Sequence, residues 1–139
     1  MKTYARSRQT TASPERIWSI WSDTSTWKDW NPNVASMEID GPFRQGAHLV
    51  MHTRENRTHQ MQLTKLENGR SFELLTRVIP GTTFTFACEV KPAAGGSEIS
   101  QGLRVGGPLG PIFGPMTGDR VAATFTELLD GLAKVGESG

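Results

Sequence analysis

The sequence predicts an α+β fold in which an antiparallel sheet of about seven strands packs against a long C-terminal helix. Three observations support this prediction: a short helix signal near the start, a series of segments with alternating apolar and polar residues, and a helical apolar period near the end. Helices at both ends of an antiparallel sheet are typical of a layered fold. The chain has 139 residues, and we expect one domain, 1–139.

The first segment, residues 1–12, is predicted to be an edge strand because it is polar, contains several threonines and has no helical period. A helix is expected to follow from Ser13, whose side chain can cap free backbone N–H groups. Pro14 suits the first helical position, where its missing N–H would have no partner. A second short helix is expected over residues 24–30 and should end at Asn31, which precedes a proline.

About six strands are predicted between residues 34 and 106, because apolar and polar residues alternate there and turn signals such as Asn68-Gly69 and Pro80-Gly81 separate the segments. The apolar positions would share the inward face of the sheet. Composition alone leaves two readings of this face open, a filled core or the wall of a ligand cavity. Its residues are Met37, Ile39, Leu49, Met51, Met61, Leu63, Phe72, Leu74, Phe84, Phe86, Ile99 and Leu103.

Residues 106–118 combine many glycines and prolines with an apolar helical spacing. Two readings stay open: a bent, loosely held helix start over a cavity mouth, with Ile112, Phe113 and Met116 facing in, or a packed crossover to the last helix. The final amphipathic helix is expected to run to about residue 135. Its apolar face is set by Val121, Phe125, Leu128 and Leu132.

Several separated patterns combine with this element order: Ser13-Pro14-Glu15-Arg16-Ile17-Trp18, Trp30-Asn31-Pro32, Gly41-Pro42-Phe43, Ile79-Pro80-Gly81-Thr82 and Gly107-Pro108-Leu109-Gly110-Pro111. Together they resemble the START-like helix-grip superfamily (SRPBCC), and more closely its bacterial polyketide cyclase/dehydrase-like branch. The resemblance spans nearly the whole chain. It implies a strongly curved sheet wrapped around the last helix, with an apolar cavity between them.

The resemblance favours a cavity over a filled core, and we expect a defined set of residues to line it. Thioethers such as those of Met51 and Met116 adapt to varied apolar shapes. Trp30 would add apolar area and an N–H donor, whereas Trp27 is expected to be partly exposed. The predicted ligand-binding residues are Trp30, Met51, His59, Met61, Leu63, Phe72, Leu74, Thr76, Phe84, Phe86, Gln101, Ile112, Phe113, Met116 and Phe125.

Polar groups are few on the predicted inward face, and each has two readings. Thr76 and Gln101 could orient a ligand or could satisfy backbone groups. His59 begins its strand, so a partly exposed position at the rim is expected. Cys88 lies among apolar neighbours and is expected to be a buried, protonated thiol.

Three function classes follow from these features. The first is binding of a hydrophobic or aromatic small molecule of lipid, polyketide, isoprenoid or quinone type, which would be the partner of this protein. The second is a polyketide cyclase or dehydratase, for which His59 is the candidate acid or base, with Glu73 or Arg77 at the rim if the strand register slips by one residue. The third is a protein-interaction module of the co-chaperone type.

Several other functions are disfavoured. The formal net charge of +1 argues against a nucleic-acid binder. His48 and His52 would lie about 13 Å apart on a strand, so they could not share a metal ion. We therefore expect no metal and no cofactor. No apolar run of membrane-spanning length or secretory signal is evident, which predicts a cytoplasmic protein, and a homodimer stays open.

Overall fold

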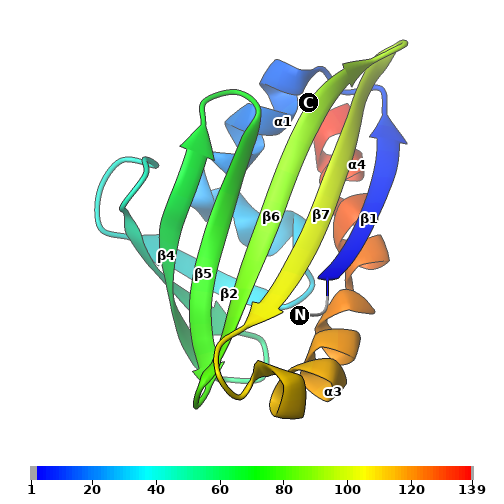
Figure 1. Ribbon diagram of the computed structural model, residues 1–139. Coiled ribbons are helices and arrows are strands. Elements are labelled where there is room, and N and C mark those ends of the chain that lie inside the picture. The colour runs from blue at the N-terminus through cyan, green and yellow to red at the C-terminus, as the bar shows by residue number, and fades with distance from the viewer. Residues whose placement is uncertain (1–2, 139) are drawn as a thin grey trace.

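The computed structural model describes residues 3–138, which form a seven-stranded antiparallel sheet with the order β1-β7-β6-β5-β4-β3-β2 (Figure 1). The strands are β1 (Thr3–Thr10), β2 (Val34–Ile39), β3 (His48–Thr53), β4 (Thr58–Glu67), β5 (Ser71–Ile79), β6 (Thr82–Ala93) and β7 (Gly96–Gly106). The helices are α1 (Pro14–Trp21), a 3₁₀ turn η1 (Thr24–Thr26), α2 (Trp27–Trp30), α3 (Gly110–Ala122) and α4 (Phe125–Ser138).

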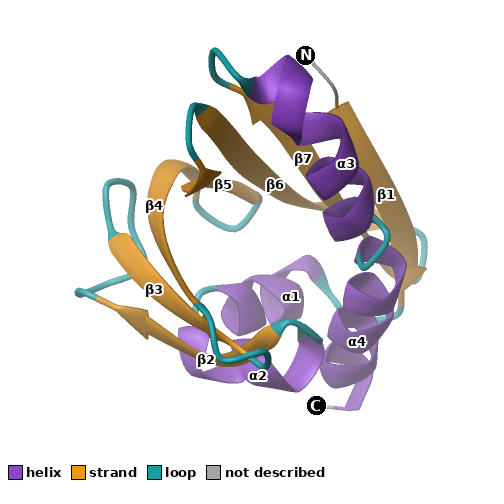
Figure 2. Cartoon of the chain, turned by 90° about the horizontal axis from the view of Figure 1, so that it is seen from below, coloured by secondary structure: helices purple, strands orange, loops and turns teal. Residues whose placement is uncertain are grey.

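The sheet curls into an arc, and all the helices lie on its concave side (Figures 1 and 2). Figure 2 shows α3 and α4 crossing the open side of this arc, while α1 and α2 lie beneath it. The first strand pairs with the last strand, and β1 and β2 form the two edges of the sheet. This is the helix-grip arrangement, so the predicted fold class is confirmed.

The early helices form for the reasons that the sequence indicates. Ser13 caps α1, since its hydroxyl accepts a hydrogen bond from the backbone N–H of Arg16 at 3.1 Å. The apolar face of α1 carries Ile17, Ile20 and Trp21, which are all buried against the sheet. The helix therefore covers one end of the concave face.

Phe72 of β5 lies at the centre of an aromatic cluster beneath α1. Its ring centroid lies 5.3 Å from those of Trp21 and Phe43, 6.2 Å from that of Trp18 and 6.0 Å from that of Trp27. Most of these pairs are edge-to-face, the geometry that the aromatic quadrupole favours. The cluster therefore fills this end of the concave face.

The long C-terminal helix is bent between α3 and α4. The backbone N–H of Ala123 donates to the carbonyl oxygen of Asp119, and that of Thr124 donates to the carbonyl oxygen of Val121. The backbone N–H of Leu128 then donates to the carbonyl oxygen of Thr124 at 2.9 Å. Helix α4 begins at Phe125 and is amphipathic, and its apolar face is buried against the sheet and the early helices.

The expected orientation of Ile112, Phe113 and Met116 is wrong. Their exposed fractions are 69%, 42% and 75%, because the opposite face of α3 packs on the sheet. That face is a row of small residues: Gly110, Gly114, Gly118 and Ala122.

Glycine is required on this face because β7 and β1 come close to α3. A Cβ atom at Gly114 would lie 2.3 Å from Cγ1 of Val105, and one at Gly118 would lie 2.9 Å from the ring of Tyr4. The Tyr4 hydroxyl also donates a hydrogen bond to Asp119 of α3 at 2.5 Å. Residues 106–118 are thus a close-packed helix over most of their length.

Gly114→Ala should lower the free energy of unfolding by about 1–2 kcal/mol, because the overpacking at Val105 outweighs the better helix propensity of alanine. Gly110→Ala is the matched control, since its Cβ would lie 3.7 Å from the same Val105 atom, an ordinary contact. Denaturant unfolding of both variants measures the difference. Equal stability of the two variants would show that α3 does not pack on β7 through this face.

Candidate ligand-binding cavity

A cavity of about 410 Å³ lies on the concave face, between the strands β3 to β7 and the helices α2, α3 and α4. Most residues predicted to line a cavity do line this one, although their role in binding stays a prediction. They come from five strands and two helices, so the cavity depends on the curvature of the sheet. These residues are Trp30, Met51, His59, Met61, Phe72, Leu74, Thr76, Phe84, Phe86, Gln101 and Phe125.

The other predicted residues lie elsewhere. Leu63 does not line the cavity, although its cross-strand partner Leu74 does, because neighbouring core side chains enclose Leu63 completely. Ile112, Phe113 and Met116 are on the outer side of α3, as described above, and they also do not line it.

Trp30 is one of the aromatic residues that line the cavity. The side chain is 4% exposed, and its Nε1 atom is buried without a hydrogen-bond partner. The Nε1 atom of Trp27, in contrast, donates to the carbonyl oxygen of Trp21 at 2.9 Å. Trp27 is 3% exposed, so its expected partial exposure is wrong, and the reason is this buried hydrogen bond. An unpaired buried N–H is costly, and Trp21, which does not line the cavity, carries one as well.

Three other polar side chains of the cavity lining, those of Thr76, Cys88 and Gln101, already have protein partners. The Thr76 hydroxyl donates to the carbonyl oxygen of Gln60 at 2.8 Å. The Cys88 thiol donates to Oε1 of Gln101 at 3.0 Å, and both residues are buried. Within residues 3–138, no group accepts a hydrogen bond from the amide nitrogen of Gln101. Gln101 therefore keeps donors for another acceptor.

Cys88 is an inert thiol in this setting. Burial raises the pKa of the Cys88 thiol far above its ordinary value, more than the hydrogen bond to Gln101 lowers it. The thiolate is the reactive form of cysteine, so nucleophilic catalysis by Cys88 is disfavoured.

His59 is a half-buried titratable residue of the cavity lining. Burial lowers the pKa of His59 below 6.5, and the positive charge of Arg57 lowers it further. The imidazole is therefore neutral at neutral pH. It can accept one hydrogen bond and donate another, without placing a charge in the cavity.

The lining residues that are exposed to solvent define the mouth of the cavity: Asn33, Arg54, Glu55, Arg57 and Arg120. Sequence reasoning missed all of them, because they lie in loops or on a helix face outside the apolar pattern. Asn33 joins two sides of the mouth, since its amide nitrogen donates to the Thr124 hydroxyl at 3.3 Å, at the bend between α3 and α4.

The β3–β4 hairpin that carries three of these residues is tightly built. Asn56 adopts a left-handed backbone conformation with φ of 64°, which asparagine tolerates in turns. The backbone N–H of Thr53 donates to the carbonyl oxygen of Arg57 at 2.8 Å, and the backbone N–H of Arg57 donates to the Thr53 hydroxyl at 3.0 Å. The hairpin backbone is therefore held in place at the mouth by its own hydrogen bonds.

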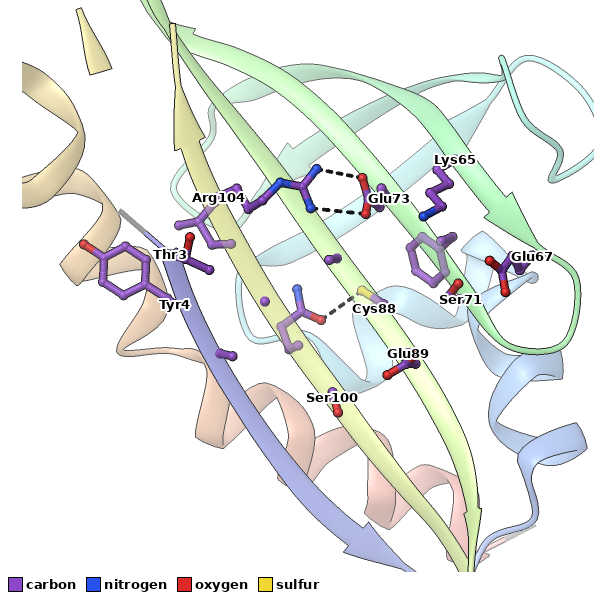
Figure 3. A pocket seen from close by; sticks show the side chains of 16 residues that line it. Thr3, Tyr4, Lys65, Glu67, Ser71, Glu73, Cys88, Glu89, Ser100 and Arg104 are labelled. Carbon is purple, nitrogen blue, oxygen red and sulfur yellow. Dashed lines mark hydrogen bonds and ion pairs between the residues drawn. The ribbon is translucent and has the colours of Figure 1, made fainter. Parts of the chain in front are cut away.

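A second hollow, of about 370 Å³, lies on the convex face of the sheet (Figure 3). Its floor is formed by small residues in register on neighbouring strands, Ala5, Gly102 and Ala87. Beside it, Arg104 donates two hydrogen bonds to Glu73, at 2.9 and 3.2 Å. This pair lowers the pKa of the Glu73 carboxyl.

Glu73 and Arg77 were expected at the cavity rim only if the strand register slipped by one residue. Glu73 lies on the convex face, Arg77 is exposed, and neither lines the cavity, so the strand register is the predicted one. His48 and His52 lie on β3 beside different carboxylates, Asp40 and Glu38. No group of three or more potential metal ligands is found in the described part of the chain.

Comparison with known protein families gives one match that spans the chain. The model for "Polyketide cyclase / dehydrase and lipid transport" matches residues 1–137. The chain belongs to this family. A comparison with curated proteins gave no match. No helix within residues 3–138 is long and apolar enough to cross a membrane.

Solved structures agree with the family fold. A Mesorhizobium loti protein is 10% identical over 99% of this chain and 98% of its own, with a TM-score of 0.80. A START superfamily protein from Mycobacterium smegmatis is 17% identical over 98% and 97%, with a TM-score of 0.76. Truncated norcoclaurine synthase from Thalictrum flavum is 15% identical over 96% and 92%, with a TM-score of 0.73. These similarities establish the START-like fold of this family member.

Cys88 should not react with Ellman's reagent in the folded protein at mildly alkaline pH, because burial keeps the thiol protonated. After unfolding in guanidinium chloride, one thiol per chain should react. Absorbance of the released chromophore measures both states. Rapid stoichiometric reaction of the folded protein would contradict the buried, protonated state.

The ring of His59 should titrate below the ordinary histidine pKa, and Arg57→Gln should raise its pKa, because the substitution removes a positive charge that disfavours the imidazolium. The increase should be partial, since burial is the larger cause. NMR titration of the histidine ring protons gives both values. Arg70→Gln, at the opposite end of the hairpins, is the matched control and should leave the pKa of His59 unchanged. A pKa of His59 that is insensitive to Arg57 would contradict this interpretation.

Proposed function

We propose that this protein binds a small hydrophobic or aromatic molecule of lipid, polyketide, isoprenoid or quinone type in the cavity between the sheet and the C-terminal helix. The observation that carries the proposal is the cavity itself, which measures about 410 Å³ and has mainly apolar walls with a few polar side chains. Native interiors are close-packed and rarely leave voids larger than a water molecule. The family description, which includes lipid transport, supports the same class of ligand.

The dimensions and the walls of the cavity fit this role. A volume of about 410 Å³ lies within the range of small-molecule sites, which combine apolar walls with a few polar groups. Burying about 200 Å² of apolar ligand surface would contribute about 5 kcal/mol before the costs of association. The amide nitrogen of Gln101 would then orient the ligand through a hydrogen-bond acceptor, and Trp30 would contact its apolar part.

A cyclase or dehydratase is the second candidate, because His59 places a neutral imidazole at the cavity wall. Such an enzyme needs a positioned acid and base near the substrate. The remaining ionisable side chains of the described lining are Cys88, which is kept protonated, and the charged residues at the mouth. Binding therefore explains more of the cavity than catalysis does.

Nile red, a neutral apolar dye, should bind with a rise in fluorescence, and Trp30→Phe should weaken its binding about two- to tenfold because the smaller ring offers the dye less apolar wall. Trp21→Phe is the matched control. Trp21 also has a buried, unpartnered indole N–H, but it does not line the cavity. Its substitution should leave the dissociation constant unchanged.

Met61→Trp, which fills the cavity, should abolish binding while circular dichroism shows a folded protein. If this variant binds Nile red as the natural sequence does, the dye occupies another surface, such as the exposed side of α3, and the proposal fails. Native mass spectrometry of the purified protein, followed by solvent extraction, would identify a ligand that is retained during purification.

A further inference from the structure

We infer that the cavity selects amphiphilic ligands with one oxyanion headgroup, a carboxylate or a phosphate, which the arginines at the mouth hold while the apolar body lies inside. This inference rests on the proposed function and names its ligand class. It starts from the contrast between the charges at the mouth and the neutral interior.

Positive charge is concentrated at the mouth. The cavity lining contains three arginines, Arg54, Arg57 and Arg120, and one carboxylate, Glu55, whereas the whole chain has a formal net charge of +1. In the described residues, neither Arg57 nor Arg120 has a carboxylate within ion-pair distance. These two guanidinium groups therefore keep their hydrogen-bond donors available to an anion.

Arg54 differs from the other two because the fold itself uses it. Its Nε atom donates to the carbonyl oxygen of Val34 at 3.1 Å, and its Nη2 atom donates to that of Lys28 at 2.9 Å. These bonds attach the β3–β4 hairpin to the segment around α2. Backbone carbonyls do not neutralise the guanidinium, so Arg54 adds a fixed positive charge to the mouth.

The arginines come from two sides of the cavity. Arg57 lies on the hairpin between β3 and β4, and Arg120 lies on α3, which faces that part of the sheet across the concave space (Figure 2). Planar guanidinium groups bind carboxylate and phosphate oxygens through paired hydrogen bonds. An oxyanion at the mouth could therefore be held by donors from both walls.

The interior excludes a charged headgroup, which fixes the direction of binding. His59 is neutral at neutral pH, and the other polar side chains of the lining that are not exposed are uncharged hydroxyls, amides, indoles and one thiol. An ionised headgroup placed among them would lose its hydration without gaining an opposite charge. The headgroup must then stay at the mouth, and the apolar body enters the cavity.

The hollow on the convex face provides an internal comparison. It has two cationic residues, Lys65 and Arg104, and three carboxylates, those of Glu67, Glu73 and Glu89. Its arginine is already paired with Glu73 in two hydrogen bonds, as Figure 3 shows. Of these two hollows, only the cavity on the concave face offers arginines without a carboxylate partner.

The test compares ligands that share one alkyl chain and differ in their headgroup: dodecanoate, dodecyl phosphate and dodecanol. Their dissociation constants are measured by displacement of Nile red, below the concentrations at which micelles form. We expect dodecanoate or dodecyl phosphate to bind about tenfold more tightly than dodecanol. Added salt should weaken the binding of the anions and leave that of the alcohol nearly unchanged.

The variants assign this preference to individual side chains. Arg57→Gln and Arg120→Gln should each reduce the ratio of alcohol to anion dissociation constants about three- to fivefold, and the double variant should remove most of the preference. Arg70→Gln makes the same change of charge on the β4–β5 turn, outside the cavity lining, and should leave the ratio unchanged. Circular dichroism checks that each variant is folded.

The outcomes separate this inference from the proposed function. If Nile red binds and dodecanol binds as tightly as both anions, the oxyanion preference is overturned and the binding function stands. An anion preference that persists in the double variant also overturns it, because other groups would then hold the headgroup. If neither Nile red nor any of the dodecyl ligands binds, both proposals are wrong. Discrimination between the two anions identifies which of the two headgroups the mouth prefers.

Discussion

The aromatic cluster around Phe72 is the constraint on which the rest of this structure depends. Trp21 of α1 and Phe43 of the β2–β3 loop pack against the Phe72 ring edge-to-face, with 5.3 Å between ring centroids. These rings fill one end of the concave face, where α1 lies. Because α1 is only eight residues long, it cannot cover the rest of the face. The cavity begins where the cluster ends, and Phe72 itself belongs to both.

The second constraint is the close approach of the C-terminal helix to the sheet. A Cβ atom at Gly131 of α4 would lie 2.5 Å from the carbonyl oxygen of Trp30, so the backbones of α4 and α2 are in near contact. On α3 the small residues face Val105 and Tyr4 in a similar way. This packing determines what the helix presents elsewhere. Arg120 reaches the mouth of the cavity because the face of small residues on α3 packs against the sheet.

Much of the fold was predictable because alternation and turn residues act locally. The inward positions of Leu74 and Phe84 follow from a period of two, and the structure buries both. The orientation of α3 was not predictable, because both its apolar set and its small set fit a helical period, and only the distance to β7 decides between them. The mouth residues were also missed. Arg57 and Arg120 line the same cavity but are distant in sequence, and exposed charged residues carry no period.

Different physical constraints therefore act on the residues inside the cavity and on those at its mouth. Inside, Leu74, Phe84 and Phe125 are held by the packing of the core, so their substitution would change stability together with the shape of the cavity. At the mouth, Arg57 and Arg120 are exposed, and replacing them disturbs no buried contact. Ligand charge preference could thus change through a few surface residues while the fold stays fixed. A fold of this kind separates the requirement for a stable core from the requirement for a selective entrance, which is consistent with one architecture carrying different functions.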